Sequence, residues 1–239
     1  MKLTWLGQAG YLLKTDNGMT IMIDPYMSDA LHNKVDDTYM REVPVNEDIL
    51  NMQLDVMIIT HPHEDHMDFE TLDVIFKNNP NMYVLAAYTT QFKMRAQYKQ
   101  YDLHYMLFDE GAEINIDGVK FTSTFAMHCD GSIGCIVEAD GKTICHTGDS
   151  MLCRQIRNAY PKHADAFLVP VNGKGNNMTA FDAAKLAAEL YPKNVFPMHW
   201  DMFKKYGLDV NEFKDAIKQL NASSTINIAI PEHYKEIEL

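Results

Sequence analysis

Apolar and polar positions form short runs along the first quarter of the chain, and these runs predict strands rather than long helices. "KLTWL" (2–6), "YLLKT" (11–15) and "MTIMID" (19–24) are short, and "DNG" between the last two is a hairpin signal. "LDVMIIT" (54–60) is continuously apolar, as expected for a strand buried on both faces. Residues 25–46 carry no clean period, so they predict a long loop, and loops of this length in compact domains are often functional.

The remainder of the chain passes from a strand-rich block into alternating helices and strands. Further strands are predicted at 83–87, 112–116, 119–126, 132–139, 143–148, 166–171, 194–199 and 225–230. Helices are predicted at 68–78, 90–100, 150–160, 179–191 and 210–220. Thr179 and Asp209 each precede an acidic residue by three positions, the spacing of helix caps. Without a fixed-period repeat or a linker, the pattern predicts two sheets flanked by helices in a single domain, residues 1–239.

Charge and composition exclude several classes of protein. The net charge is −12 and no basic run occurs, which argues against a nucleic-acid partner. No stretch approaches the ~20 apolar residues of a membrane span, so no membrane partner is expected. Four cysteines without a C-x-x-C pair, and a start that resembles a strand and turn rather than a signal peptide, predict a cytoplasmic protein with reduced thiols. A homo-oligomer is plausible, but no heptad demonstrates one.

The stretch "THPHEDHMD" (60–68) follows a predicted buried strand and is crowded with groups that bind metals. Pro62 disfavours a helical conformation at His61, which excludes the H-E-x-x-H helical zinc motif. In an extended segment, residues two apart point to the same side, so His61 and His63 can approach one metal. Asp65 and His66, after a turn, then face a neighbouring position. The alternative is a polar loop that merely ends a strand.

Three further candidate ligands end other predicted strands: His128, Asp149 and His199. Each alone is a weak signal, because a single histidine after a strand is more often structural. Together the candidates number seven, whereas a catalytic zinc takes three protein ligands and one water. Two divalent ions ~3.5–4 Å apart, sharing a carboxylate and a hydroxide, would use all seven. Imidazole and carboxylate ligands suit zinc, manganese or iron, and zinc or manganese is favoured.

These motifs resemble those of a known family. "THPHEDH" matches the T-H-x-H-x-D-H signature of the metallo-β-lactamase superfamily, and "HTGDS" and "PMHWDMF" are similar to its later motifs. "WLGQAG", "PVNG" and "MHWDMF" resemble the L-ascorbate-6-phosphate lactonase (UlaG-like) group. The resemblance implies an α/β fold, a four-layer αββα sandwich with a dinuclear site at one edge of its two sheets.

The resemblance also implies a division of the ligands. It assigns His61, His63 and His128 to one ion and Asp65, His66 and His199 to the other, with Asp149 bridging. In the oxygen-reducing diiron branch of the superfamily a glutamate stands in the place of His63, so a hydrolase is favoured.

The chemistry expected of such a pair of ions is hydrolysis. Two ions lower the pKa of a bound water from 15.7 toward ~7, and the resulting hydroxide attacks a carbonyl or phosphoryl centre. Asp65 is expected to ligate a metal and to orient this hydroxide, which makes it the candidate catalytic residue. His146 is expected to hydrogen-bond near the site, and residues 26–40 are a candidate lid.

The substrate is expected to be a small anionic molecule. The loop "PVNGKGNNMT" (170–179) precedes a predicted helix start, where anions are attracted, and Asn172 and Lys174 are candidate contacts for a sugar phosphate or carboxylate. The alternative is a flexible loop with a solvated lysine. The leading hypothesis is therefore a metal-dependent hydrolase that opens a lactone or cleaves an ester, with a phosphodiesterase and a non-catalytic metal-binding protein as alternatives.

Overall fold

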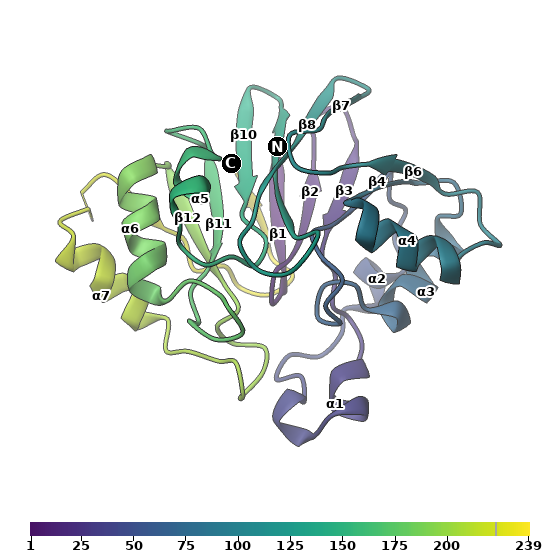
Figure 1. Ribbon diagram of the computed structural model, residues 1–239, viewed down its shortest axis with the longest axis horizontal. Helices are drawn as coiled ribbons and strands as arrows, with labels where there is room; N and C mark the ends of the chain where they lie inside the picture. Colours follow the sequence, from purple (N-terminus) through teal and green to yellow (C-terminus); the bar gives the residue numbers. More distant parts are fainter. Residues whose placement is uncertain (223) are drawn as a thin grey trace.

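Two mixed sheets form the centre of the protein in a computed structural model that describes residues 1–222 and 224–239 (Figure 1). Each sheet has seven strands within this described part of the chain. The first sheet has the order β14 (Glu236–Glu238), β1 (Lys2–Gly7), β2 (Gly10–Lys14), β3 (Thr20–Ile23), β4 (Val56–Ile59), β5 (Tyr83–Ala86) and β6 (His104–Leu107). The second has the order β13 (Asn227–Ile228), β12 (Asn194–Met198), β11 (Ala166–Pro170), β10 (Lys142–His146), β9 (Ile133–Ala139), β8 (Val119–Phe125) and β7 (Glu113–Ile116).

The two sheets share one pairing pattern. In the first sheet β14, β1, β2 and β3 pair antiparallel, whereas β3, β4, β5 and β6 pair parallel. In the second, β7 to β10 pair antiparallel and β10 to β13 pair parallel. Parallel strands end at the same edge, so the segments that follow β4, β10 and β12 leave their sheets at carboxyl ends, where α/β proteins bind ligands.

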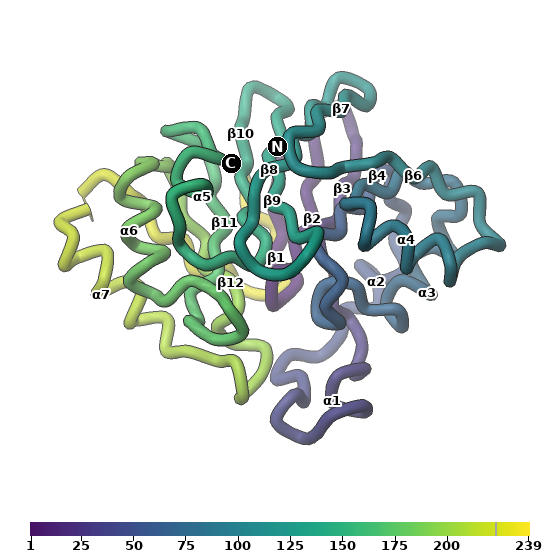
Figure 2. Tube along the Cα trace, viewed as in Figure 1, coloured from purple at the N-terminus to yellow at the C-terminus, as the bar shows by residue number. Residues whose placement is uncertain are grey.

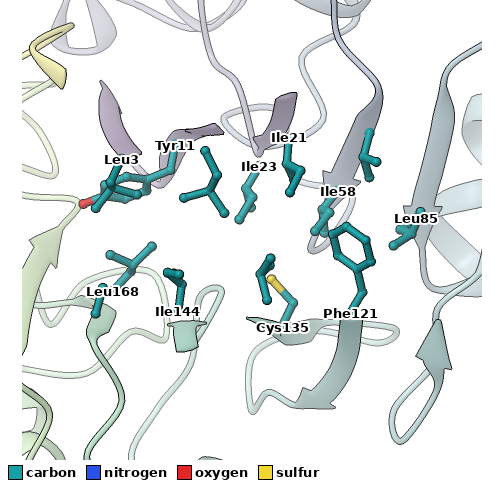
Figure 3. Close-up of a cluster of buried hydrophobic side chains, with 14 of the residues drawn as sticks. Leu3, Tyr11, Ile21, Ile23, Ile58, Leu85, Phe121, Cys135, Ile144 and Leu168 are labelled. Atoms are coloured by element: carbon teal, nitrogen blue, oxygen red, sulfur yellow. The ribbon is translucent and has the colours of Figure 1, made fainter. Parts of the chain in front are cut away.

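The main hydrophobic core lies between the sheets. Side chains from the first sheet, such as Ile23 and Ile58, face Phe121 and Ile144 of the second (Figure 3). All four are fully buried. Because the outer faces of β4, β5, β11 and β12 are also apolar, both sheets need a covering layer, and this explains the continuous apolar runs in the sequence.

Helices supply that layer on both sides. On the first sheet lie α2 (Glu47–Leu50), α3 (Phe69–Asn78) and α4 (Tyr88–Gln97), and on the second lie α5 (Arg154–Asn158), α6 (Ala180–Leu190) and α7 (Asn211–Gln219) (Figure 1). The fold is therefore the expected αββα sandwich. None of the helices in the described residues is long and apolar enough to pass through a membrane.

The predicted elements are largely confirmed, with differences at the edges. The predicted loop 25–46 contains α1 (Ala30–Lys34) and the short helix η1 (Asp37–Tyr39). The helix predicted at 150–160 is shortened to α5, because the backbone of Ser150 and Met151 bonds to neighbouring loops instead. Strand 225–230 is reduced to β13.

Two strands at the margin of the first sheet were not predicted. Strand β6 has half-exposed, weakly patterned residues, and β14 has only three. Strand β14 pairs with β1, and Leu239 N donates to Met1 O at 3.1 Å, so the last and first residues lie together (Figure 2). The pairing partner, and not the local sequence, forms these strands.

Candidate metal centre

All seven predicted ligands lie at the carboxyl edge of the two sheets. The segment after β4 carries His61, His63, Asp65 and His66, while His128, Asp149 and His199 follow β8, β10 and β12. Strand β8 runs in the same direction as β10, since both pair antiparallel with β9. Four of the candidates therefore come from the first sheet and three from the second, and they lie together at the carboxyl edge of both sheets.

The histidines and acids form three sets of converging ligand atoms, of which two share no residue and the third, His61, His66 and Asp149, joins them. In one group, His63 Nδ1 lies 2.9 Å from His61 Nε2 and 3.0 Å from His128 Nε2. In the other, Asp65 joins His66 and His199, and the ligand atoms within each group lie within 4.8 Å of one another. Both sets are those that the sequence resemblance implied.

Asp149 lies between the two groups. Its Oδ2 is 3.7 Å from His128 Nε2 and 3.5 Å from His66 Nε2, so one carboxylate oxygen faces both sides. Its Oδ1 is 2.8 Å from His199 Nε2. This is the position of a ligand that two cations could share.

The donor set fits a divalent metal. Buried polar atoms in proteins are rarely left without a partner. Yet His66 Nε2 is buried without a hydrogen-bond partner in the described residues, and His199 Nε2 and Asp149 Oδ1, although buried 2.8 Å apart, do not have the geometry of a hydrogen bond. Imidazole nitrogens and carboxylate oxygens that converge in this way suit zinc, manganese or iron. A metal would satisfy the three atoms together.

The protonation states favour cation binding. Burial opposes the charge of Asp149, but His199 and His66 outweigh it and hold its pKa well below the usual range, so the group is a carboxylate. Burial also lowers the pKa of His61, which keeps its ring in the neutral, metal-binding form. Burial opposes protonation of His66 as well, yet Asp149 and Asp65 raise its pKa well above the ordinary value. The acidic side chains thus attract positive charge to this point, and metal binding there would release a proton.

Asp24, at the end of β3, supports the centre from behind. Its side chain is fully buried and accepts from Thr60 N at 2.7 Å, Thr60 Oγ1 at 2.5 Å and His66 Nδ1 at 2.8 Å. Because Nδ1 of His66 donates to Asp24, its Nε2 is directed at the site. Such outer partners orient the ligands and raise their basicity.

Two amide side chains hold the acidic ligands. Gln8 Nε2 donates to Asp65 Oδ2 at 3.2 Å, and Asn177 Nδ2 donates to Asp149 Oδ2 at 3.0 Å. Together with Asp24 these residues were missed as functional groups at the sequence level. A signal was present for Gln8, which lies in "WLGQAG", one of the stretches that carry the family resemblance, and for Asn177, which lies in the candidate substrate loop "PVNGKGNNMT".

His146 lies beside the centre and is not part of either group. Its ring is fully buried, its Nε2 donates to Ala9 O at 2.8 Å, and its Nδ1 accepts from Gly148 N at 3.0 Å. Both nitrogens of the neutral ring are therefore used, as the structural role predicted from the sequence requires. Burial lowers the pKa of His146 below its ordinary value.

This histidine predicts a pH dependence of stability. Below the ordinary histidine pKa of about 6.5, the unfolded chain binds a proton at His146 that the folded chain does not. The free energy of unfolding therefore decreases as the pH is lowered. The metal-free wild type should lose about 1 kcal/mol more unfolding free energy than His146→Gln between about pH 6.5 and 5.5. Denaturant unfolding at the two pH values measures the difference, and equal losses would show that His146 contributes nothing.

A cavity of about 310 Å³ opens over the candidate metal ligands. Asn172 and Lys174 line it, as do Leu31, Tyr39 and Tyr206. The predicted loop 25–46 thus does reach the site. A larger hollow of about 450 Å³ lies at the opposite edge of the sheets, where the lining residues include none of the seven candidates.

The lining of the cavity contains both buried hydrogen-bond acceptors and a lysine that is engaged by the backbone. Asn172 Oδ1 and Asn177 Oδ1 are buried acceptors without a partner in the described residues. The Lys174 ammonium donates to Lys205 O and Gly207 O, at 3.0 Å each, so two of its three hydrogens are engaged by the backbone. A direct contact between Lys174 and an anionic substrate stays a prediction.

The fold and the histidine–aspartate cluster define a class of protein. Residues 2–199 match the family described as "Beta-lactamase superfamily domain". The chain belongs to the metallo-β-lactamase superfamily.

Similar proteins identify the family within this superfamily. The chain is 30% identical over 217 residues to a UPF0173 metal-dependent hydrolase of Sulfurisphaera tokodaii, which covers 89% of each chain. It is 28% identical to a UPF0173 metal-dependent hydrolase of Saccharolobus solfataricus over 222 residues, or 91% of this chain and 92% of the relative. Among solved structures, Igni18, a metallo hydrolase from Ignicoccus hospitalis, superposes with a TM-score of 0.74 at 24% identity, over 100% of this chain and 98% of that one. The chain is thus a metal-dependent hydrolase of the UPF0173 family.

Proposed function

We propose that this hydrolase uses two divalent ions to open a lactone, or to cleave an ester, of a small anionic substrate. One observation carries the proposal: six donor side chains lie in two groups of three on either side of the buried Asp149 carboxylate, beside a cavity of about 310 Å³. When bound, a pair of zinc or manganese ions supplies a water of lowered pKa and a Lewis acid for the developing negative charge.

The residues of the centre have different proposed roles. His61, His63 and His128 would hold one ion, Asp65, His66 and His199 would hold the other, and Asp149, which lies between the two sets, would serve both. Asp65 would also orient the nucleophile, since its carboxylate lines the cavity, as that of Asp149 does, and Gln8 Nε2 holds its Oδ2 in place. Asn177 fixes Asp149 in the same way.

The cavity supports a small substrate. Its volume of about 310 Å³ is at the lower end of the range for small-molecule sites. The buried amide oxygens of Asn172 and Asn177 would accept hydrogen bonds from hydroxyl groups beside the scissile bond. A lactone is favoured by the sequence likeness to the ascorbate-phosphate lactonases, and an anionic group would be drawn to the cations.

Metal analysis joined to an activity panel tests the proposal. We expect the purified protein, loaded with zinc or manganese, to bind two ions per chain and to hydrolyse lactones faster than esters or phosphodiesters. Because the ions supply several kcal/mol of transition-state stabilisation, chelation should lower turnover by about a thousandfold, and the same metal should restore it.

Other results of the same experiment would favour one of the alternative functions. Preferred cleavage of phosphodiesters would replace the lactonase by a phosphodiesterase with the same centre. Two bound ions without turnover of any panel compound would leave a non-catalytic metal-binding protein. A single bound ion would contradict the dinuclear arrangement.

A further inference from the structure

Three chain segments form the mouth of the cavity above the candidate metal ligands. They are the α1–η1 region, the loop 172–178 and the connection from β12 to α7, residues 199–210. Helix α1 and the β12–α7 connection project at the same end of the molecule (Figure 1). The residues that follow α1 are joined to this connection by backbone hydrogen bonds from Glu42 N to Met202 O at 3.0 Å and from Lys205 N to Thr38 O at 3.3 Å.

Lys174 connects the second segment to the third. The two carbonyls that its ammonium binds, Lys205 O and Gly207 O, belong to the residues on either side of Tyr206. Neither residue is in a helix or strand, so no regular backbone pairing fixes this stretch. The two contacts therefore fix the backbone on both flanks of one tyrosine.

Tyr206 lines the cavity and contacts two neighbours, Gly175 and Tyr39. Its ring covers Gly175, where an added Cβ would lie 3.7 Å from its Cε1. Its hydroxyl is 3.5 Å from the hydroxyl of Tyr39, whose ring lies 4.6 Å below the Lys205 ammonium. The hydrogen bond to Tyr39, followed by burial, raises the pKa of Tyr206 to about 12. The phenol is thus a neutral hydrogen-bond donor at physiological pH.

We propose that Lys174 is a positioning residue that holds Tyr206 at the mouth of the cavity, where its hydroxyl donates a hydrogen bond to a non-reacting oxygen of the substrate. Tyr206 shares the cavity with Asp65 and His199, so a substrate seated on the centre meets the phenol. The group recognised is an oxygen acceptor, such as a hydroxyl, carbonyl or carboxylate oxygen beside the scissile bond. The part that concerns Tyr206 rests on the proposed function, whereas the part that concerns Lys174 depends on the chain alone.

Hydrogen exchange on the metal-loaded full chain tests the role of Lys174 without turnover. The amides of Lys205 and Leu208 are protected by bonds to Thr38 O and Trp200 O. In Lys174→Met the flanks of Tyr206 lose two hydrogen bonds, so we expect these amides to exchange about tenfold faster. Lys204→Met removes an exposed lysine from the same connection, whose ammonium lies 3.9 Å from Glu42 Oε1, and it should leave them almost unchanged because such an exposed ion pair contributes little. Unchanged exchange in Lys174→Met would overturn the positioning role.

Kinetics on a substrate from the panel separates positioning from direct contact. Tyr206→Phe should raise KM about tenfold with kcat almost unchanged, because it removes a hydrogen bond that substrate and transition state share. Lys174→Met should raise KM similarly, and the double variant no further, since both changes remove one interaction. Lys174→Arg, which can still donate to two carbonyls, should restore most of the affinity.

The opposing outcomes are distinct. If the two effects multiply to about a hundredfold in the double variant, Lys174 contacts the substrate itself and the positioning role is wrong. A Tyr206→Phe variant with wild-type KM removes Tyr206 from recognition. If no panel compound is hydrolysed, the proposed function fails together with the role of Tyr206, while the exchange result still decides the role of Lys174.

Discussion

Asp149→Asn is expected to lower kcat/KM by about a thousandfold and to reduce the metal content below two ions per chain. The carboxylate lies 3.7 Å from a ligand of the first group and 3.5 Å from a ligand of the second. A neutral amide offers one acceptor oxygen and no charge, so it cannot serve both sides. The thousandfold figure corresponds to about 4 kcal/mol of lost electrostatic stabilisation. Turnover and elemental analysis of the same preparation measure both effects.

A surface substitution controls for the change of charge. Asp102→Asn alters an exposed carboxylate outside both ligand groups and should keep metal content and activity at wild-type values. An Asp149→Asn protein that retains two ions and full activity would contradict the bridging role.

Asp24→Asn is expected to lower the free energy of unfolding by about 3 kcal/mol in the metal-free protein. The carboxylate is fully buried and accepts from three donors, two on Thr60 and one on His66. An asparagine keeps one acceptor oxygen and turns an N–H toward a neighbouring donor, so at least one buried donor loses its partner and the buried pair with His66 is broken. The midpoint of thermal unfolding should fall by about 6–12 °C.

The metal-free state is chosen because bound metal adds its own contribution to stability. Asp29→Asn, at an exposed position without a side-chain cap contact, is the matched control and should unfold as the wild type does. A change of less than about 0.5 kcal/mol in Asp24→Asn would indicate that the buried carboxylate does not support the fold.

Much of the sandwich could be predicted from hydrophobic patterning. Continuous apolar runs at 54–60 and 166–171 are characteristic of strands covered on both faces, and helices α6 and α7 have clear amphipathic patterns. Strands β6 and β14 were missed, because a strand at the margin of a sheet is formed by its neighbour and needs no apolar pattern of its own.

The residues of the candidate site also fall into those that could be predicted from the sequence and those that could not. Residues that end strands and carry metal-binding groups, such as His61 and Asp149, could be selected from the sequence, and the structure brings all seven together. Their binding of metal stays a prediction. The partners of these residues could not be selected, because Asp24 and Asn177 act through contacts with residues distant in the chain. The bonds that engage Lys174 depend on loop geometry that no local pattern encodes.

The division of the ligands between the two sheets has a consequence for biosynthesis. A chain emerging from the ribosome presents four of the donors by residue 66, but the remaining three follow only at 128, 149 and 199. The second sheet must dock on the first before either group of donors is complete. A centre that used all seven donors would therefore be complete only after His199 has been synthesised and the second sheet has docked.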